Sequence, residues 1–211
     1  MSKKPFSFYS SYLRLNFSRL NAGGWIFLSI FSPKLVVELG MGDGTLLETL
    51  AKRDSKSIYI GIELDNEQCE KARSRIRLSN VFIVNSSIED LVTTFQDESV
   101  DQFIAVLPDP AFIDQKKEEQ WKPLYKSLYD KLKKQGCFRL VTELTDELLQ
   151  PVSDDQYSAW AGWLECCFIS LGFTLACQQE GAPRQYLSRC IEQFKADPQR
   201  IRMITLDLLK H

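Results

Sequence analysis

The chain has 211 residues, which is enough for one sizeable α/β domain with a core of its own. Its hydrophobic content of 44% and charged content of 26% are ordinary for a globular protein, and no run of residues reaches the ~18 apolar residues of a membrane span. The six cysteines form no C-x-x-C pair and His211 is the only histidine, so we expect no metal site and reduced thiols in a cytoplasmic protein.

The net charge of −2 is distributed unevenly along the chain. Residues 1–34 carry five Lys or Arg and no acid, so this segment has a charge of +5 and the remainder must carry −7. The same segment places apolar and aromatic side chains at helical spacing, namely Tyr9, Tyr12, Leu13, Phe17 and Leu20. We therefore expect residues 1–33 to form an N-terminal helical arm, which either packs on the body or contacts a substrate through Arg14 and Arg19.

The strongest motif is a strand followed by a glycine turn and a helix. The apolar run Lys34–Leu39 predicts a strand buried on both faces, and Thr45–Arg53 predicts a helix. Between them stand Gly40, Gly42 and Gly44, and glycine permits positive φ and a close approach of ligand to backbone. The turn also presents a helix N-terminus, which favours an anionic or polar ligand. The G-x-G-x-G spacing differs from the G-x-G-x-x-G dinucleotide fingerprint.

The second predicted strand, Ser57–Glu63, ends in an acid. Glu63 lies 19 residues after Gly44, about the distance at which a doubly wound fold places a carboxylate on ribose hydroxyls. A carboxylate suits this role because it accepts two hydrogen bonds from a vicinal diol. Asp65 is the alternative, although it also fits the start of the next predicted helix, Asn66–Leu78, which Asn66 could cap.

Two further strands end in polar residues. Asn80–Asn85 predicts the third strand, and Ser99–Leu107 predicts the fourth, which leads into Pro108-Asp109-Pro110. The two prolines end the strand and hold Asp109 at its carboxyl end. Because ligands bind at that edge of an open α/β sheet, Asp109 is a candidate functional residue.

The remaining chain continues the alternation of helices and strands. We expect a helix over 121–134 that Gly136 ends, and another helix after Pro151. The last three predicted strands are Cys137–Thr142, Phe173–Cys177 and Met203–Leu208. Residues 34–211 are thus predicted to form a single α/β domain with a mostly parallel, seven-stranded sheet flanked by helices.

Three motifs together resemble the tRNA (guanine-N7)-methyltransferase family, within the Rossmann-like S-adenosylmethionine-dependent methyltransferases. They are Glu38-Leu39-Gly40-Met41-Gly42-Asp43-Gly44, Gly61-Ile62-Glu63 and Pro108-Asp109-Pro110, and their order and spacing fit from about residue 34 to 146. The resemblance implies a Rossmann-like methyltransferase fold and S-adenosyl-L-methionine as cofactor. The cofactor-binding residues it implies are Glu38, Gly40, Gly42, Gly44, Glu63, Asn85, Ser86 and Leu107.

The resemblance also implies where the acceptor binds. In this family the aspartate of Pro-Asp-Pro lies beside the reactive methyl and the target guanine, which makes Asp109 both the catalytic and a substrate-binding residue. A Thr-Asp element holds the base and corresponds here to Thr142-Glu143 or Thr145-Asp146. A Thr-x-x-Glu element corresponds to Ser188 with Glu192, one residue out of step. The implied partner is tRNA, and both a monomer and a homodimer remain open.

One departure from the family concerns charge. The Pro-Asp-Pro motif of the family is usually followed by Trp and a basic, His-containing run, whereas this chain has Ala111 to Lys117 with fewer cations. Phosphate contacts would have to come from Arg14, Arg19, Lys116, Lys117, Lys122, Arg184 and Arg189. Two alternatives therefore stay open: a methyltransferase acting on a protein or small molecule, and a non-catalytic relative that binds the cofactor.

Overall fold

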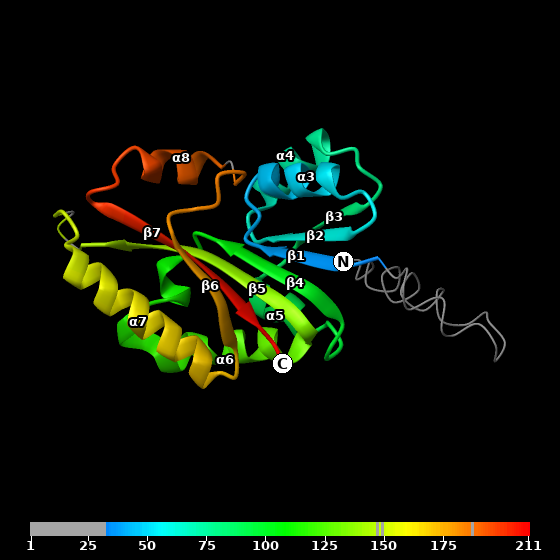
Figure 1. Ribbon diagram of the computed structural model, residues 1–211. Coiled ribbons are helices and arrows are strands. Elements are labelled where there is room, and N and C mark those ends of the chain that lie inside the picture. The colour runs from blue at the N-terminus through cyan, green and yellow to red at the C-terminus, as the bar shows by residue number, and fades with distance from the viewer. Residues whose placement is uncertain (1–32, 147, 149, 187) are drawn as a thin grey trace. The chain divides into compact units, whose positions relative to one another are not determined.

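The computed structural model describes residues 33–146, 148, 150–186 and 188–211 (Figure 1). The predicted N-terminal arm, including Arg14 and Arg19, falls on residues that lie outside this description except for Pro33. Within the described part, seven strands form one sheet: β1 (Leu35–Leu39), β2 (Ile58–Glu63), β3 (Val81–Asn85), β4 (Val100–Val106), β5 (Leu132–Thr145), β6 (Thr174–Glu180) and β7 (Ile201–Leu209). The helices are α3 (Thr45–Arg53), α4 (Asn66–Arg75), α5 (Ile88–Val92), α6 (Glu118–Lys131), α7 (Asp154–Ser170) and α8 (Arg189–Lys195), with 3₁₀ turns at Pro110–Phe112 and Gln115–Lys117.

The sheet has the order β3-β2-β1-β4-β5-β7-β6. Only β7 runs antiparallel to its neighbours among these strands, so the predicted mostly parallel sheet and α/β fold class are confirmed. In the register, Leu39 lies opposite Ile62 of β2 and Ala105 of β4. The carboxyl ends of these three strands therefore meet at one edge of the sheet, where the glycine turn, Glu63 and Asp109 follow.

Helices cover both faces of the sheet (Figure 1): α3, α4 and α8 lie on one face and α5, α6 and α7 on the other. The larger core cluster, on the α6 and α7 side, contains the fully buried Phe138 and Phe168 together with Trp121 and Tyr125, which pack edge to face. The second cluster joins Met41 and Leu46 at the glycine turn to Tyr186 and Ile191 near α8. The turn and the C-terminal segment thus share one packed face.

Two local predictions were wrong. The helix predicted to run to residue 134 ends at Lys131, because Leu132 already pairs with Val100 in the sheet, and Gly136 lies inside β5 instead of ending a helix. A Cβ at Gly136 would lie 2.7 Å from the Lys133 carbonyl oxygen, so close backbone approach is what requires a glycine here. Helix α4 is capped by Asp65, whose side chain accepts from the Glu67 N–H, and not by Asn66.

A glycine of β2 supports the turn from beneath. A Cβ at Gly61 would overlap Met41 Sδ and lie 2.8 Å from Leu47 Cδ2. We expect Gly61→Ala to lower the free energy of unfolding by about 1–3 kcal/mol through overpacking. Gly162→Ala is the control, because Gly162 lies in α7 with no atom within 4 Å of the added Cβ, and it should raise stability by about 0.5–1 kcal/mol. Urea unfolding measures both, and equal effects would contradict the packing argument.

Candidate functional site

The glycine turn between β1 and α3 is a left-handed backbone with open space above it. Gly40, Gly42 and Gly44 have φ values of 68°, 56° and 74°, which L side chains rarely adopt. Cβ atoms at Gly40 and Gly42 would meet nothing within 4 Å, whereas one at Gly44 would press on Ile76 and Ala72. The first two glycines therefore leave a cradle for a ligand, and the third allows α3 to pack on the α4 region.

Glu63 is attached to this turn by its side chain. Its Oε2 accepts a hydrogen bond from the Gly42 N–H at 2.9 Å, and its Oε1 accepts from the Asp65 N–H at 2.9 Å. Each carboxylate oxygen keeps a further lone-pair site, so the group can still accept from two hydroxyls. These two hydrogen bonds fix the Glu63 carboxylate, which is predicted to bind the ribose, at the end of β2 next to the cradle.

Glu38 is the other acid close to the turn, and it is buried. Only 3% of the residue is exposed, its Oε2 has no hydrogen-bond partner among the described residues, and the backbone of Leu47 hydrogen-bonds the carboxyl. Burial, with the nearby charges of Asp43 and Glu63, raises the pKa of Glu38 to about 8. A buried polar atom without a partner is rare in folded proteins, so Glu38 is a candidate for a functional role.

Asn85 and Ser86 follow β3 at the same edge. The Asn85 amide donates to the backbone oxygens of Glu63 and Leu64 at 3.0 and 2.9 Å, and the Ser86 N–H donates to the Glu63 oxygen at 3.0 Å. These bonds bring both residues beside Leu64, whose side chain is 71% exposed. Leu64 was not among the predicted site residues, because a single apolar residue between Glu63 and Asp65 forms no pattern in the sequence.

Asp109 lies at the end of β4, the strand beside β1. It is exposed, and its Oδ1 accepts from the Ala111 N–H at 2.8 Å, so that it caps the 3₁₀ turn that begins at Pro110. The preceding Leu107 has a φ of 51°, unusual for a non-glycine residue, and its N–H donates to the Val141 oxygen of β5 at 2.7 Å. Strained backbone of this kind is frequent at functional sites, and here it directs the chain into Pro108 and Asp109.

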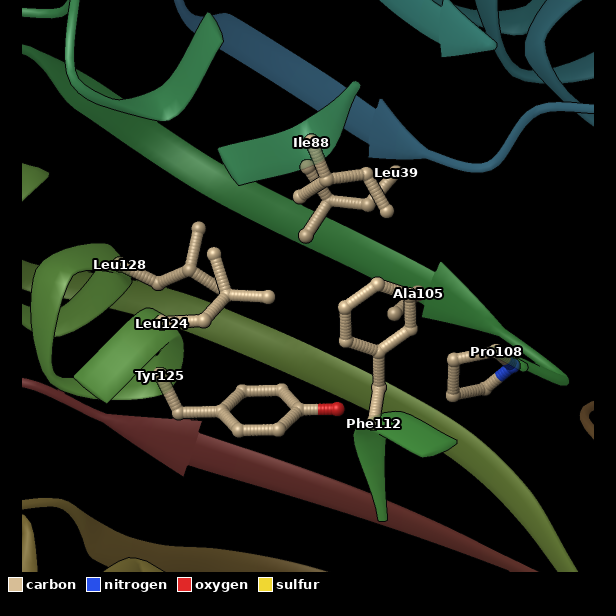
Figure 2. Close-up of a pocket in the computed structure, with 8 residues that line it drawn as sticks. All are labelled: Leu39, Ile88, Ala105, Pro108, Phe112, Leu124, Tyr125 and Leu128. Atoms are coloured by element: carbon tan, nitrogen blue, oxygen red, sulfur yellow. The ribbon is translucent and has the colours of Figure 1, made fainter. Parts of the chain in front are cut away.

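A small cavity lies close to this segment, lined by Leu39, Ile88, Ala105, Pro108, Phe112, Leu124, Tyr125 and Leu128 (Figure 2). Its volume is about 10 Å³, hardly room for one water, and its walls are almost wholly apolar. The Tyr125 hydroxyl points toward Phe112 within it (Figure 2). We interpret it as a packing gap beneath Pro108 and not as a ligand site.

The predicted acceptor residues of β5 differ in burial. Glu143 is half-buried, its Oε2 is without a partner in the described part of the chain, and burial raises the pKa of its carboxyl to about 7. Thr145 is exposed at the end of the strand. Asp146 accepts from the N–H groups of Leu148 and Gln150 at 2.8 and 3.3 Å, which is a turn-forming role. Glu143 is therefore the best placed of the three to bind an added group.

Ser188 and Glu192 belong to α8 and already have local partners. Ser188 caps the helix by accepting from the Ile191 N–H at 3.2 Å, and Glu192 pairs with Lys195 at 3.2 Å. Helix α8 packs through Ile191 in the cluster that contains Met41. The two residues thus lie on the face that also carries the glycine turn, and their binding role stays a prediction.

The predicted basic residues are partly neutralised. Lys117 pairs with Asp114 at 3.4 Å, and Lys122 pairs with Glu118. Arg184 is exposed and lines a polar cavity of about 320 Å³ over β5, β6 and β7, while the side chain of Arg189 is outside the description. None of the described helices has the length and hydrophobicity to cross a membrane, and no metal-binding group of His, Cys, Asp and Glu occurs among the described residues.

Comparison with known proteins identifies the family. The family model described as "Putative methyltransferase" matches residues 32–157, more than half of the chain. The chain belongs to this methyltransferase family, whose cofactor is S-adenosyl-L-methionine. The open cradle at Gly40 and Gly42, the anchored carboxylate of Glu63 and the unpaired Glu38 Oε2 fit a cofactor with a ribose and a positive charge.

One curated relative, a tRNA (guanine-N(7)-)-methyltransferase of Mycoplasma genitalium, is 33% identical over 89 residues. The match covers 40% of this chain and 42% of that protein, so it spans less than half the length of the relative. With the family model, it confirms the resemblance that the motifs indicated.

Solved structures show the same fold at low identity. The 16S rRNA methyltransferase KamB has a TM-score of 0.67 at 13% identity, covering 92% of this chain and 96% of its own. A 16S rRNA (adenine(1408)-N(1))-methyltransferase from Catenulisporales acidiphilia has a TM-score of 0.62 at 12% identity, with 92% of each chain covered. At this identity the likeness concerns the fold alone.

The raised pKa of Glu143 predicts a pH-dependent stability. A carboxyl whose folded pKa lies above its unfolded value of 4.5 stabilises the fold most below pH 4.5 and loses that contribution as pH rises through 7. Between pH 4.5 and 8, we expect the stability of Glu143→Gln to rise relative to wild type by up to about 3 kcal/mol. Urea unfolding across this range tests it, and a constant difference between the two proteins would refute it.

Proposed function

We propose that this protein transfers the methyl group of S-adenosyl-L-methionine to N7 of a guanine in tRNA, in the cytoplasm. The observation that carries the proposal is the position of Asp109. It is held by two prolines and a hydrogen bond to Ala111 at the end of β4, beside the strand that leads into the glycine turn. The relative from Mycoplasma genitalium supports tRNA as the acceptor.

The proposed reaction depends on aligning guanine N7 with the methyl group of the cofactor and requires no proton transfer. The bound cofactor supplies a methyl group that is already electrophilic on its sulfonium sulfur. Guanine N7 has an in-plane lone pair and no proton, so no general base is needed, and the protein acts by orienting the two reactants. Asp109 accepts hydrogen bonds from guanine N–H groups and opposes the positive charge that develops on the ring.

Glu143 provides a second acid on the acceptor side. It lies on β5, two residues after Val141, whose carbonyl oxygen accepts from the Leu107 N–H and so joins β5 to the segment that carries Asp109. Its free Oε2 is available to a base that has left the RNA stack. In this proposal, Asp109 and Glu143 contact the base, while Lys and Arg side chains contact phosphates without reading sequence.

A second candidate function is methyl transfer to an acceptor other than RNA. It is favoured by the ion pairs of Lys117 and Lys122, which leave little free positive charge after the Pro-Asp-Pro motif. Nonspecific RNA affinity comes mostly from such charge. The acceptor assay below separates the two functions.

Glu63→Ala should weaken cofactor binding. The variant loses the carboxylate that faces the cradle and the bond to the Gly42 N–H, so we expect the Kd for the cofactor to rise about ten- to a hundredfold. Glu67→Ala is the control, since Glu67 is exposed on α4 and pairs with Lys71. Calorimetry measures both, and an unchanged Kd in Glu63→Ala would remove Glu63 from the ribose site.

Asp109→Asn should abolish most transfer while leaving cofactor affinity nearly unchanged. The amide oxygen can still accept from the Ala111 N–H, so the variant removes mainly the charge. We expect the rate of transfer from labelled cofactor to bulk tRNA, read as N7-methylguanosine after nuclease digestion, to fall about 10²–10³-fold. Asp114→Asn is the matched control, because Asp114 caps the next 3₁₀ turn through the Lys116 N–H at 2.8 Å.

The same assay tests the proposed function itself. Wild-type protein should label tRNA and leave total cell protein and small metabolites unlabelled. Label in protein or metabolites alone would establish the second candidate function. Cofactor binding without label in any pool would indicate a non-catalytic relative, and equal losses in Asp109→Asn and Asp114→Asn would make the role of Asp109 purely structural.

A further inference from the structure

Glu38 is placed where a lone carboxylate is costly. Strand alternation directs it to the same face as Val36, which packs with Met41 and Leu46 of the turn and α3. Its sheet neighbours are Gly61 on β2 and Ile104 on β4, and neither can pair with a charge. With 3% exposure and one unpartnered oxygen, the carboxyl is shielded from water and incompletely hydrogen-bonded.

Among the described residues, the charged and titratable groups that face Glu38 offer it no unpaired cation. The turn contributes Asp43 and the end of β2 contributes Glu63, and both disfavour a second negative charge. The loop before α8 contributes Tyr186, whose hydroxyl accepts from Arg139. Arg139 of β5 lies opposite Ile104 of β4 in the sheet. Its guanidinium already donates to the Asp207 carboxylate through hydrogen bonds of 2.6 and 2.7 Å.

Burial and the negative charges of Asp43 and Glu63 act in the same direction. Both favour the neutral form of the carboxyl, and together they raise the pKa of Glu38 to about 8. At pH 7 the side chain in the free protein is therefore mainly a carboxylic acid. A cation brought into the cradle would reverse this balance, because an opposite charge within a few ångströms favours ionisation.

We propose that Glu38 is protonated in the free protein and releases its proton to solvent when the cofactor binds, so that its carboxylate balances the positive charge of the ligand. Glu38 is then a positioning residue that links cofactor affinity to pH. No covalent bond changes: the proton passes from the Glu38 carboxyl to water or buffer. The inference rests on cofactor use as stated under the proposed function, but it is independent of the acceptor.

The test is calorimetric titration of S-adenosylmethionine into the full chain between pH 6 and 8.5. For a linked proton, the Kd should fall about tenfold per pH unit between pH 6 and 7.5. In buffers of different ionisation enthalpy, the heats should show the release of most of a proton at pH 7. The cofactor's own amino group also titrates, so the Glu38-dependent part is the difference from Glu38→Gln.

Glu38→Gln keeps the size of the neutral acid and cannot ionise. The ratio of its Kd to that of wild type should grow by about tenfold per pH unit between pH 6 and 7.5, and it should release no proton beyond that of the ligand. Glu67→Gln is the control, since Glu67 is exposed on α4, pairs with Lys71 and should keep the wild-type pH dependence. Equal slopes for wild type and Glu38→Gln would overturn the proposal.

Carbon-13 NMR of the glutamate carboxyls gives a readout that needs no variant binding. In wild-type protein at pH 7, the Glu38 signal should have the shift of a neutral acid without cofactor and of a carboxylate with it. A carboxylate shift in the free protein would also overturn the proposal. Absence of cofactor binding at every pH would instead remove the proposed function, so the two failures are distinguishable.

Discussion

The site depends on one hydrogen bond, from the Gly42 N–H to Glu63 Oε2 at 2.9 Å. A turn with three glycines at positive φ loses much conformational entropy when it becomes ordered. Because glycines have no side chains, the turn is held mainly by hydrogen bonds to its own backbone N–H and C=O groups. Glu63 supplies such a contact from the neighbouring strand, while the Met41 N–H bonds to the Ile62 oxygen at 2.9 Å. The parallel pairing of β1 with β2 thereby fixes both the cradle and the acid beside it, and a ligand meets a surface that is already ordered.

This arrangement places acids where they cost stability. Glu38 and Glu143 each keep a buried oxygen without a partner in the described residues, and the buried Thr142 hydroxyl does the same on the opposite side of β5. By strand alternation, Glu38 and Glu143 lie on the face that carries the glycine turn, whereas Thr142 lies on the face that the aromatic cluster around Phe138 and Phe168 fills with apolar contacts. The core therefore supports an edge of the sheet that carries incompletely hydrogen-bonded polar groups, as expected when function and stability compete for the same residues.

Elements with a clear hydrophobic period could be predicted from sequence, as Thr45–Arg53 shows, since its bounds agree with α3. The position of Gly136 inside a strand could not be predicted, because it follows from the pairing of Leu132 with Val100. That pairing is a tertiary effect, which local propensity does not reveal. Leu64 escaped notice because one exposed apolar residue forms no pattern. Ser188 and Asp146 show that a motif match alone does not establish a binding role. Ser188 caps a helix and Asp146 forms a turn, and these local roles use the same types of side chain as ligand binding.

The match to the family model covers only one part of the sheet. The family model ends at residue 157, so it covers β1 to β5 but not β6, α8 and β7. The cofactor cradle lies wholly in the matched half, between β1 and β2. The proposed acceptor side borders the other half, since Glu143 pairs with Met203 of β7 and Ile191 of α8 belongs to the core cluster that contains Met41 of the glycine turn. The hydrogen bonds that hold the glycine turn join it to Ile62 and Glu63 of β2 and involve none of these C-terminal elements, so under the proposed function differences in β6, α8 and β7 would act on the acceptor side.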